Sequence, residues 1–429
     1  MGKYSTDKRM FVTFVGMDVH ARSISASAVD VRTGEAFSAR FAGAAMEHEL
    51  AEWVGGLPQP AYCAYESGCT GFGLARGLRS LGFACDVIAV STLPKSQRDR
   101  KQKCDRLDAR SIRREIANPD SDYSVVWVPD ERTEAERDLC RAYRTAVDTC
   151  KQARQRLRMF LLRHGHVWDE RTKTGNLKKA WTRDFTKWLD SISFGQPSAE
   201  KAYAALRRQE RAAAEEVAEL RREVLALSRE PHNKPYADAL SCLKGVDREG
   251  AMLAIAEFGD FSRFGSGRGV SCWLGTVPTD ASSGEHDRHG RITKCGDKWL
   301  RKALVEGWSG AASWKTGRKA VPKGAEPSAA AQAIAARANR RLFERYAHLV
   351  GGRGKCHNKA KVAVVSELAR WIWVVGMQVQ AELQAPRRDA RAAATQDHTP
   401  RRTTYHVGPH ATQDDIPRRT TNHAGRHTV

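Results

Sequence analysis

The first 117 residues of the chain restrict its fold most strongly, because short apolar segments alternate there with helical ones. Short apolar runs bounded by turn residues predict β-strands, and an apolar residue at every third or fourth position predicts a helix. A mixed order of this kind predicts a sheet with helices packed against it. The predicted elements are strands at 10–18, 23–31 and 36–42, a helix at 46–55, a strand ending at 66, a helix at 71–81, a strand at 84–88 and a helix from 104 onward.

Two acidic residues stand where buried strands of this sheet reach the surface. Asp18 closes the apolar run 11–17, and Glu66 closes the run 61–65. The order of elements is the one expected of a ribonuclease-H-like mixed sheet, in which the first and fourth strands are neighbours. We therefore expect these two carboxylates to meet at one end of the sheet, although they are distant in the sequence.

Two further acids, Asp105 and Asp108, begin the next predicted helix. A spacing of three residues places both on one helical face, close enough to share a cation. Carboxylate oxygens are ligands that Mg²⁺ prefers, so the four acids together predict a magnesium site. Two plainer interpretations stay open. The strand-end carboxylates could simply be solvated, and the helical pair could be favoured by the helix dipole alone.

The charge of the chain indicates a polyanionic partner. Its 429 residues contain 71 Lys and Arg against 50 Asp and Glu, which gives a formal net charge of +21. Such an excess favours nucleic acid. No membrane partner is expected, because the longest apolar segment, 362–377, contains Glu367 and Arg370 and is shorter than a spanning helix. The N-terminus lacks the pattern of a secretion signal, so we expect a cytoplasmic protein.

Two long segments in the middle of the chain have helical periodicity. Residues 131–163 and 198–230 are rich in Ala, Leu, Glu and Arg, which predicts two antiparallel helices forming a coiled-coil arm. The segment between them, 166–194, mixes aromatic and basic side chains that could stack on bases and neutralise phosphates. Equally, tryptophans at helical spacing are usually core residues and lysines usually a solvated face. The residues concerned are Trp168, Trp181, Phe185, Trp188, Lys178 and Lys179.

A second, mainly α-helical unit is predicted over 231–378. Its opening segment, 240–250, resembles a helix-hairpin-helix element, whose hairpin amides bind a DNA phosphate. Asp247 stands where the second hairpin glycine is usual, and its carboxylate would repel a phosphate. Beyond this unit the apolar pattern stops and a near-duplicate segment follows, so we expect a disordered tail over 379–429.

A polar loop within 274–301 carries a second candidate for chemistry. Ser283 lies directly before Gly284, and several cationic residues follow. A serine hydroxyl in these surroundings could attack a phosphodiester, because cations stabilise the charge that builds on the transferring phosphoryl group. The neighbouring Ser282 is an alternative nucleophile, and a solvated loop without chemistry is the plainer interpretation.

Two motifs together carry a resemblance to a known family. The first comprises the four acids in the segments Gly16-Met17-Asp18, Tyr65-Glu66-Ser67-Gly68 and Cys104-Asp105-Arg106-Leu107-Asp108-Ala109. The second comprises the serine loop with Gly290-Arg291-Ile292-Thr293-Lys294, Gly296 and Leu300-Arg301. In this order, over about 10–377, the chain resembles the insertion sequence 110 family of transposases, with a RuvC-like domain followed by a C-terminal transposase domain. Asp297 departs from the asparagine that this family commonly has there.

The resemblance implies a DNA recombinase of a bacterial mobile element. It implies that Ser283 forms a covalent link to DNA during strand exchange, and that the protein is associated with the nucleoid. The partners it implies are element ends and target DNA, a guide RNA, and further copies of the chain in a dimer or tetramer. The Mg²⁺ ligands that it implies are Asp18, Glu66, Asp105 and Asp108.

Two other functions stay open on the residues alone. One is a RuvC-like junction-resolving endonuclease that uses only the acids. The other is a nucleic-acid-binding protein without catalysis, in which the acids serve solubility. All three functions predict that added salt weakens binding, so salt dependence does not separate them.

The predicted organisation has four parts. These are a RuvC-like domain at 10–130, a helical coiled-coil arm with a basic aromatic insert at 131–230, a C-terminal serine transposase domain at 231–378 and the tail at 379–429. Cationic residues from the first three parts are candidates for nucleic-acid contact. They are Arg98, Arg100, Lys101, Lys103, Lys178, Lys179, Arg288, Arg291, Lys294 and Arg301.

Overall fold

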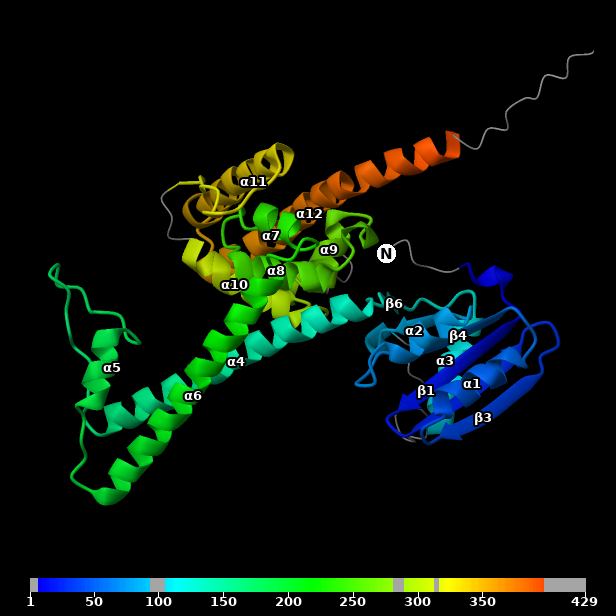
Figure 1. Cartoon of the computed structure of the whole chain (residues 1–429), viewed down its shortest axis with the longest axis horizontal. Coiled ribbons are helices and arrows are strands. Elements are labelled where there is room, and N and C mark those ends of the chain that lie inside the picture. The colour runs from blue at the N-terminus through cyan, green and yellow to red at the C-terminus, as the bar shows by residue number, and fades with distance from the viewer. Residues whose placement is uncertain (1–6, 93–104, 281–288, 312–315, 397–429) are drawn as a thin grey trace, which may run out of the picture. The chain divides into compact units, whose positions relative to one another are not determined.

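Figure 1 shows the computed structural model of the chain, which describes residues 7–92, 105–280, 289–311 and 316–396. The chain divides into two compact units, Met1–Ala381 and Glu382–Val429. The first unit begins with an α/β part, a mixed β-sheet with helices packed on it, and continues into a mostly helical region, as the sequence predicts. The described part of the second unit is the end of the last helix.

The α/β part contains a six-stranded sheet in the order β3-β2-β1-β4-β5-β6. β1 is antiparallel to β2 and parallel to β4, so the prediction that the first and fourth strands are neighbours is confirmed. The predicted elements agree with the observed ones to within a few residues, and only the edge strand β6 has no predicted counterpart. The bounds are β1 Thr13–His20, β2 Ser23–Asp30, β3 Ala36–Ala42, α1 Met46–Gly55, β4 Ala61–Glu66, α2 Gly73–Ser80, β5 Ala84–Ile88, α3 Asp105–Ala117 and β6 Val125–Val126.

Helices cover both faces of this sheet. Successive side chains of a strand point to opposite faces, so β1 and β4 each contribute to two separate apolar clusters. Met17 and Tyr65 belong to the cluster that contains Leu50 of α1 and Leu74 of α2. Residues Phe14, Tyr62 and Ala64 belong to the other cluster, which contains Ile112 and Ile116 of α3.

Gly16 allows α3 to lie directly against β1. A Cβ atom at this position would collide with the backbone nitrogen of Arg113 and the carbonyl oxygen of Ala109. Both are backbone atoms in the middle of a helix, which cannot move aside as the end of a side chain can. The close approach is reinforced from β2, where Ser27 Oγ accepts a hydrogen bond of 3.2 Å from Arg113 Nη1.

The substitution Gly16→Ala is expected to destabilise the protein by about 1–3 kcal/mol, because an added methyl in a packed interface forces a backbone shift. Urea unfolding of the full chain measures this change. The matched control is Gly77→Ala in α2, where an added Cβ meets no atom within 4 Å. That control should be neutral or slightly stabilising, because alanine favours a helix more than glycine does. Equal stability of the two variants would contradict the assigned packing role.

The two long predicted helices are present as α4 (Glu131–Arg163) and α6 (Pro197–Leu227), and they pack against each other (Figure 1). α4 begins at a side-chain cap, in which Asp130 accepts a 2.7 Å hydrogen bond from Thr133 N. The pairing is antiparallel, because Phe160 near the end of α4 stacks on Tyr203 near the start of α6, with ring centroids 6.3 Å apart. A regular coiled-coil geometry stays a prediction.

The aromatic residues between these helices form a small core of their own. Phe185 of α5 (Arg183–Asp190) is buried together with Leu157 of α4 and Tyr203 of α6. Trp168 packs on the same cluster and donates a 3.1 Å hydrogen bond to the carbonyl of Lys178. The remaining partly buried aromatics of this cluster are Trp181, Trp188 and Phe194. This packing favours the core interpretation of the segment over base stacking.

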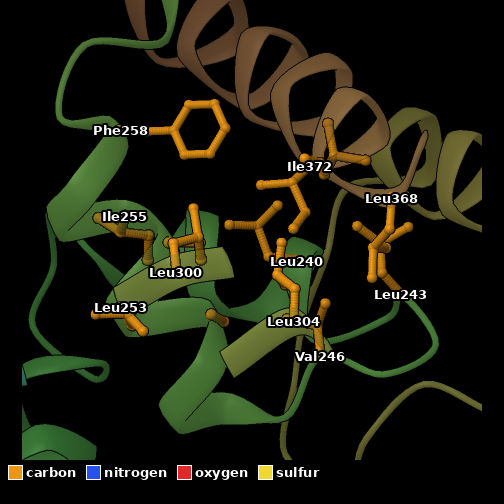
Figure 2. Packing of buried hydrophobic residues seen from close by; sticks show 14 of the residues in the cluster. Leu240, Leu243, Val246, Leu253, Ile255, Phe258, Leu300, Leu304, Leu368 and Ile372 are labelled. Atoms are coloured by element: carbon orange, nitrogen blue, oxygen red, sulfur yellow. The ribbon is translucent and has the colours of Figure 1, made fainter. Parts of the chain in front are cut away.

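The rest of the first unit is built mainly from helices around one apolar core. Figure 2 shows side chains of that core, among them Leu240, Phe258, Leu304 and Ile372, which come from four different helices. A short two-stranded sheet, β7 with β8, interrupts the helical order. The elements are α7 Lys234–Leu240, α8 Arg248–Phe258, α9 Gly267–Trp273, β7 Pro278–Asp280, β8 His289–Ile292, α10 Lys298–Ala311, α11 Ala329–Ala347 and α12 His357–Gln396.

The last helix is longer than the sequence pattern predicts. α12 continues to Gln396, beyond residue 378, where we expected order to end. Residues 397–429 lie outside the described residues. The part of α12 over His357–Ala385 is long and apolar enough to cross a membrane by length and composition alone. Its apolar side chains, including Leu368 and Ile372, are buried in the helical core, which accounts for that composition.

Candidate functional site

The structure places Asp18 near the end of β1 and Glu66 at the end of the neighbouring parallel strand β4. Each directly follows the last aligned pair of β1 and β4, Met17 with Tyr65. Both strands are buried up to these acids and become partly exposed at them. Because side chains alternate along a strand, Asp18 lies on the same face as Gly16, and Glu66 on the same face as Ala64. Both acids therefore lie on the face that α3 covers.

The other two predicted acids begin the helix that covers this face. Asp105 is the first residue of α3, and the half-buried Asp108 lies one turn later. Both have the helical spacing of Ile112, which is buried against the sheet, so all three share one side of α3. The side chain of Asp105 lies outside the described residues. The backbone thus brings the four predicted acids to one face at one end of the sheet.

Asp18 has a neighbour that is a potential proton carrier. Its Oδ2 lies 3.1 Å from Nε2 of His20, two residues on, and its side chain is 18% exposed. A carboxylate in this position is close enough to solvent for a bound cation to keep some of its water ligands, as Mg²⁺ usually does.

The serine loop belongs to a β-hairpin. β7 and β8 pair in antiparallel fashion, with Pro278 opposite Ile292 and Asp280 opposite His289. The intervening residues 281–288, which contain Ser282, Ser283 and Arg288, lie outside the described residues. The sequence predicted a polar loop here but not the strands that flank it.

Several contacts at close range hold the base of this hairpin. Cβ atoms on Gly275 or Gly296 would collide with the opposite backbone, and both glycines have positive φ angles of 67° and 88°. Arg301 Nη1 donates to the carbonyl of Leu274 at 2.7 Å. Asp297 caps α10 by accepting a 2.6 Å hydrogen bond from the backbone nitrogen of Leu300. The residues that follow the loop are therefore fixed by the helical core.

Comparison with known proteins identifies the family. The profile described as "Transposase IS116/IS110/IS902 family" matches residues 237–321, and a profile of the IS110 DEDD type, described as "Transposase", matches residues 15–165. The putative transposase y4qE of Sinorhizobium fredii is 35% identical over 322 residues, which cover 74% of this chain and 76% of that protein. This chain belongs to the IS116/IS110/IS902 family of transposases. It is thus an enzyme that recombines DNA.

A second relative of the transposase supports the same assignment. The transposase for insertion sequence element IS1533 of Leptospira borgpetersenii is 27% identical over 263 residues, which cover 60% of this chain and 72% of that protein. The region matched by the DEDD profile contains all four predicted acids, and the region matched by the other profile contains the serine loop. The family assignment therefore covers both candidate centres.

The transposase contains a buried ionic cluster that the sequence did not indicate. Glu257 of α8, with a side chain 2% exposed, accepts hydrogen bonds of 2.7 and 2.8 Å from Nε and Nη2 of Arg141 on α4. Arg137 Nε lies 3.5 Å from the same carboxylate, and Asp297 Oδ2 lies 3.9 Å from Arg141 Nη2. The cluster therefore ties α4 to the residues after the serine hairpin. From the sequence alone, Arg137 and Arg141 resemble residues on the solvated face of a long helix. Their partners lie more than 100 residues away in the sequence, so no local pattern indicates the contacts.

This cluster makes the stability of the transposase depend on pH. Burial raises the pKa of Glu257 to about 7; hydrogen bonds from Arg141 lower this pKa, and the charge of Asp297 raises it. A carboxyl pKa raised in the folded state means that the folded protein binds the proton more tightly than the unfolded chain. Stability contributed by that proton is therefore present below the ordinary glutamate pKa and is lost as pH rises to about 7.

We expect wild-type protein to lose on the order of 3 kcal/mol through Glu257 between about pH 5 and about pH 8, at about 1.4 kcal/mol per pKa unit. Glu257→Gln cannot titrate, so its unfolding free energy should vary less over that range. Urea unfolding at both pH values measures the difference. Glu344→Gln, at an exposed position on α11, is the control and should follow the wild type. Parallel pH curves for Glu257→Gln and wild type would contradict the assignment.

The described cationic candidates fall into two groups. Lys179, Arg291 and Lys294 are exposed. Lys178 is paired with Asp184 at 3.3 Å and with Glu170 at 3.6 Å, and Arg301 is used in the hairpin base. Arg98, Arg100, Lys101, Lys103 and Arg288 lie outside the described residues.

One further group in the described part of the chain has the composition of a metal site. One ligand atom from each of Glu136, Glu230 and His232 lies within 4.8 Å of the others. His232 Nε2 is 2.7 Å from Glu136 Oε1, and Arg132 Nε lies 3.9 Å from that same oxygen. A histidine between two carboxylates, with an arginine beside them, is accounted for by ion pairing, so we assign no cation to this group.

Proposed function

We propose that this transposase uses a Mg²⁺ site formed by four acids together with a serine nucleophile, Ser283. The observation that carries the proposal is the placement of Asp18 and Glu66 on adjacent strand ends, on the face covered by α3. Asp108 and the backbone of Asp105 lie on the side of α3 that faces them. The four side chains are of one ligand type and come from three separate elements, β1, β4 and α3.

The donor set suits a hard divalent cation. Carboxylate oxygens from Asp18, Glu66, Asp105 and Asp108 would hold it, and the partial exposure of Asp18 leaves room for water or a phosphate oxygen. Bound Mg²⁺ would neutralise the negative charge that develops on the scissile phosphate. His20, the last residue of β1, stays outside the proposed ligand set, because a lone histidine at a strand end is mostly structural.

The serine step separates recombination from hydrolysis. We propose that the Ser283 hydroxyl attacks the phosphorus and loses its proton, while the bond from phosphorus to one sugar oxygen breaks and that oxygen leaves as a hydroxyl. The phosphoserine ester keeps the energy of the broken bond, so a sugar hydroxyl from a second strand can reverse the reaction and join the strands. Support for this step comes from the family motif and from the fixed hairpin base next to the loop.

The proposed partners follow from family and charge. DNA would be bound at element ends and target, a guide RNA would select them, and the active form would be a homo-oligomer, a dimer or tetramer, in the bacterial cytoplasm at the nucleoid. The net charge of +21 supports binding to both nucleic acids. Among the described cations, exposure favours Lys179, Arg291 and Lys294 as phosphate contacts over Lys178 and Arg301.

The test uses full-length protein co-expressed with the noncoding DNA that flanks its gene. It is incubated with end-labelled element DNA in Mg²⁺ or in EDTA and separated on a denaturing gel. The proposal predicts label that remains on the protein in Mg²⁺ only, and loss of activity when RNase is added before the DNA. Cut DNA with no protein-bound label would indicate a junction-resolving nuclease instead. Binding with no Mg²⁺-dependent product would indicate a non-catalytic protein.

A further inference from the structure

The hairpin that joins α7 to α8, residues 241–247, encloses an ammonium group. The carbonyl oxygens of Ser241, Leu243 and Val246 lie 2.5, 2.8 and 2.8 Å from Nζ of Lys319. Lys319 comes from the segment between α10 and α11, more than 70 residues further along the chain. Three carbonyls from one short loop thus converge on a single cation from a distant segment.

An ammonium group matches this site both in its positive charge and in its number of hydrogen-bond donors. Lysine has three N–H donors and no acceptor, and here each donor has one carbonyl partner. Rings of backbone carbonyls are also the ligand type by which proteins replace the water shell of K⁺. Burial lowers the pKa of Lys319, because removal from water disfavours the charged ammonium. Hydrogen bonds to the three carbonyls offset that cost.

Other distant residues hold the same hairpin. Asn339 of α11, 2% exposed, accepts a 2.7 Å hydrogen bond from Lys244 N and donates one of 2.9 Å to the carbonyl of Cys242. Gly245, with a φ of 79°, packs against the backbone of Gly307 and Trp308 in α10. The hairpin is therefore held by residues of α10 and α11, and Lys319 adds three hydrogen bonds to its carbonyls.

We propose that this hairpin is a monovalent-cation site which Lys319 occupies in place of an ion. The class of ligand that the site would otherwise accept is K⁺, NH₄⁺ or a small alkylammonium ion. Because all three donors of Lys319 are directed at carbonyls, this lysine stabilises the hairpin and does not contact a DNA phosphate. The carboxylate of Asp247, which caps α8 by accepting from Gly250 N at 2.7 Å, is compatible with that structural role.

The first experiment opens the site with Lys319→Ala in the full chain. Thermal unfolding is followed at equal ionic strength in choline, potassium and methylammonium chloride. In choline the variant should melt about 5 °C below wild type, because three buried carbonyls lose their partner. Potassium and methylammonium should each restore at least half of the difference and leave wild type unchanged. The matched control is Lys323→Ala, at an exposed lysine in the same segment, which should respond to none of the salts.

The outcomes divide clearly. An equal loss in all three salts, or no loss, would overturn the proposal. Lys319→Met keeps the apolar stem without the charge. If Lys319→Ala does not fold, the melting temperature of this variant in the same three salts tests the proposal. A melting temperature of the methionine variant below that of wild type in choline, with partial recovery in potassium or methylammonium, would support the proposal. A wild-type value, or an equal loss in all three salts, would overturn it.

A DNA-binding measurement tests the second part of the proposal. The affinity of Lys319→Met for a labelled DNA duplex should fall with added salt as steeply as that of wild type. If the slope of log affinity against log salt concentration is smaller by about one in the variant, Lys319 neutralises a phosphate, and this part of the proposal is overturned.

Discussion

Replacing Asp18 by asparagine is expected to reduce Mg²⁺-dependent cleavage of element ends by about 10³-fold or more. Asparagine has nearly the same shape but no charge, so the strand end keeps its structure while the proposed site loses an anionic ligand. Charge stabilisation by a bound metal contributes several kcal/mol to a phosphoryl-transfer transition state, and about 4 kcal/mol corresponds to a factor of 10³. The single-turnover rate of cutting a labelled element end measures the effect.

DNA affinity separates a metal role of Asp18 from a structural one. Asp18→Asn should bind element DNA at least as well as wild type, because the change removes a negative charge from a site that receives phosphate. Asp120→Asn is the matched control, at an exposed acid of the same α/β part, and should cut at the wild-type rate. Undiminished cutting by Asp18→Asn would remove the strand-end acids from the reaction.

The α/β part shows how much of the fold a sequence can predict. Its strands are buried up to Asp18 and Glu66, so the apolar runs end where the structure reaches the surface. Gly16 carries no pattern signal, yet it sets the distance between β1 and α3. The four acids could be proposed as one group because each stands at or near the end of an element, and the order of elements determines which ends are adjacent.

Contacts between distant polar residues could not be predicted in this way. Glu257 and Lys319 look like ordinary charged residues in their own segments. Only the tertiary structure places Arg141 beside Glu257, and the carbonyls of the 241–247 hairpin beside Lys319. β7 and β8 are short and polar, so periodicity did not indicate strands. α12 extends past 378 without an apolar stripe and contains Pro386, which disfavours a helix interior, so neither periodicity nor propensity indicated the continuation.

Replacing Ser283 by alanine is expected to abolish the protein-bound DNA label, with a loss of at least about 10³-fold. Alanine has no hydroxyl, so the phosphoserine ester cannot form, and no neighbouring base or metal compensates for an absent nucleophile. Ser282→Ala is the matched control in the adjacent position and should keep the label. The label retained on protein in denaturing gels, with Mg²⁺ and element DNA, measures both variants.

The cutting activity of Ser283→Ala then decides between recombination and hydrolysis. If the serine attacks the phosphate, both cutting and labelling are lost, because the bond to the sugar oxygen breaks only as the ester forms. If water attacks at the acids, cutting persists without label, and the protein is a nuclease in which the C-terminal unit only binds DNA. A label that depends on Ser282 instead would move the nucleophile by one residue and leave the chemistry otherwise as proposed. Each result identifies a different nucleophile, so the two alanine variants together assign the reaction.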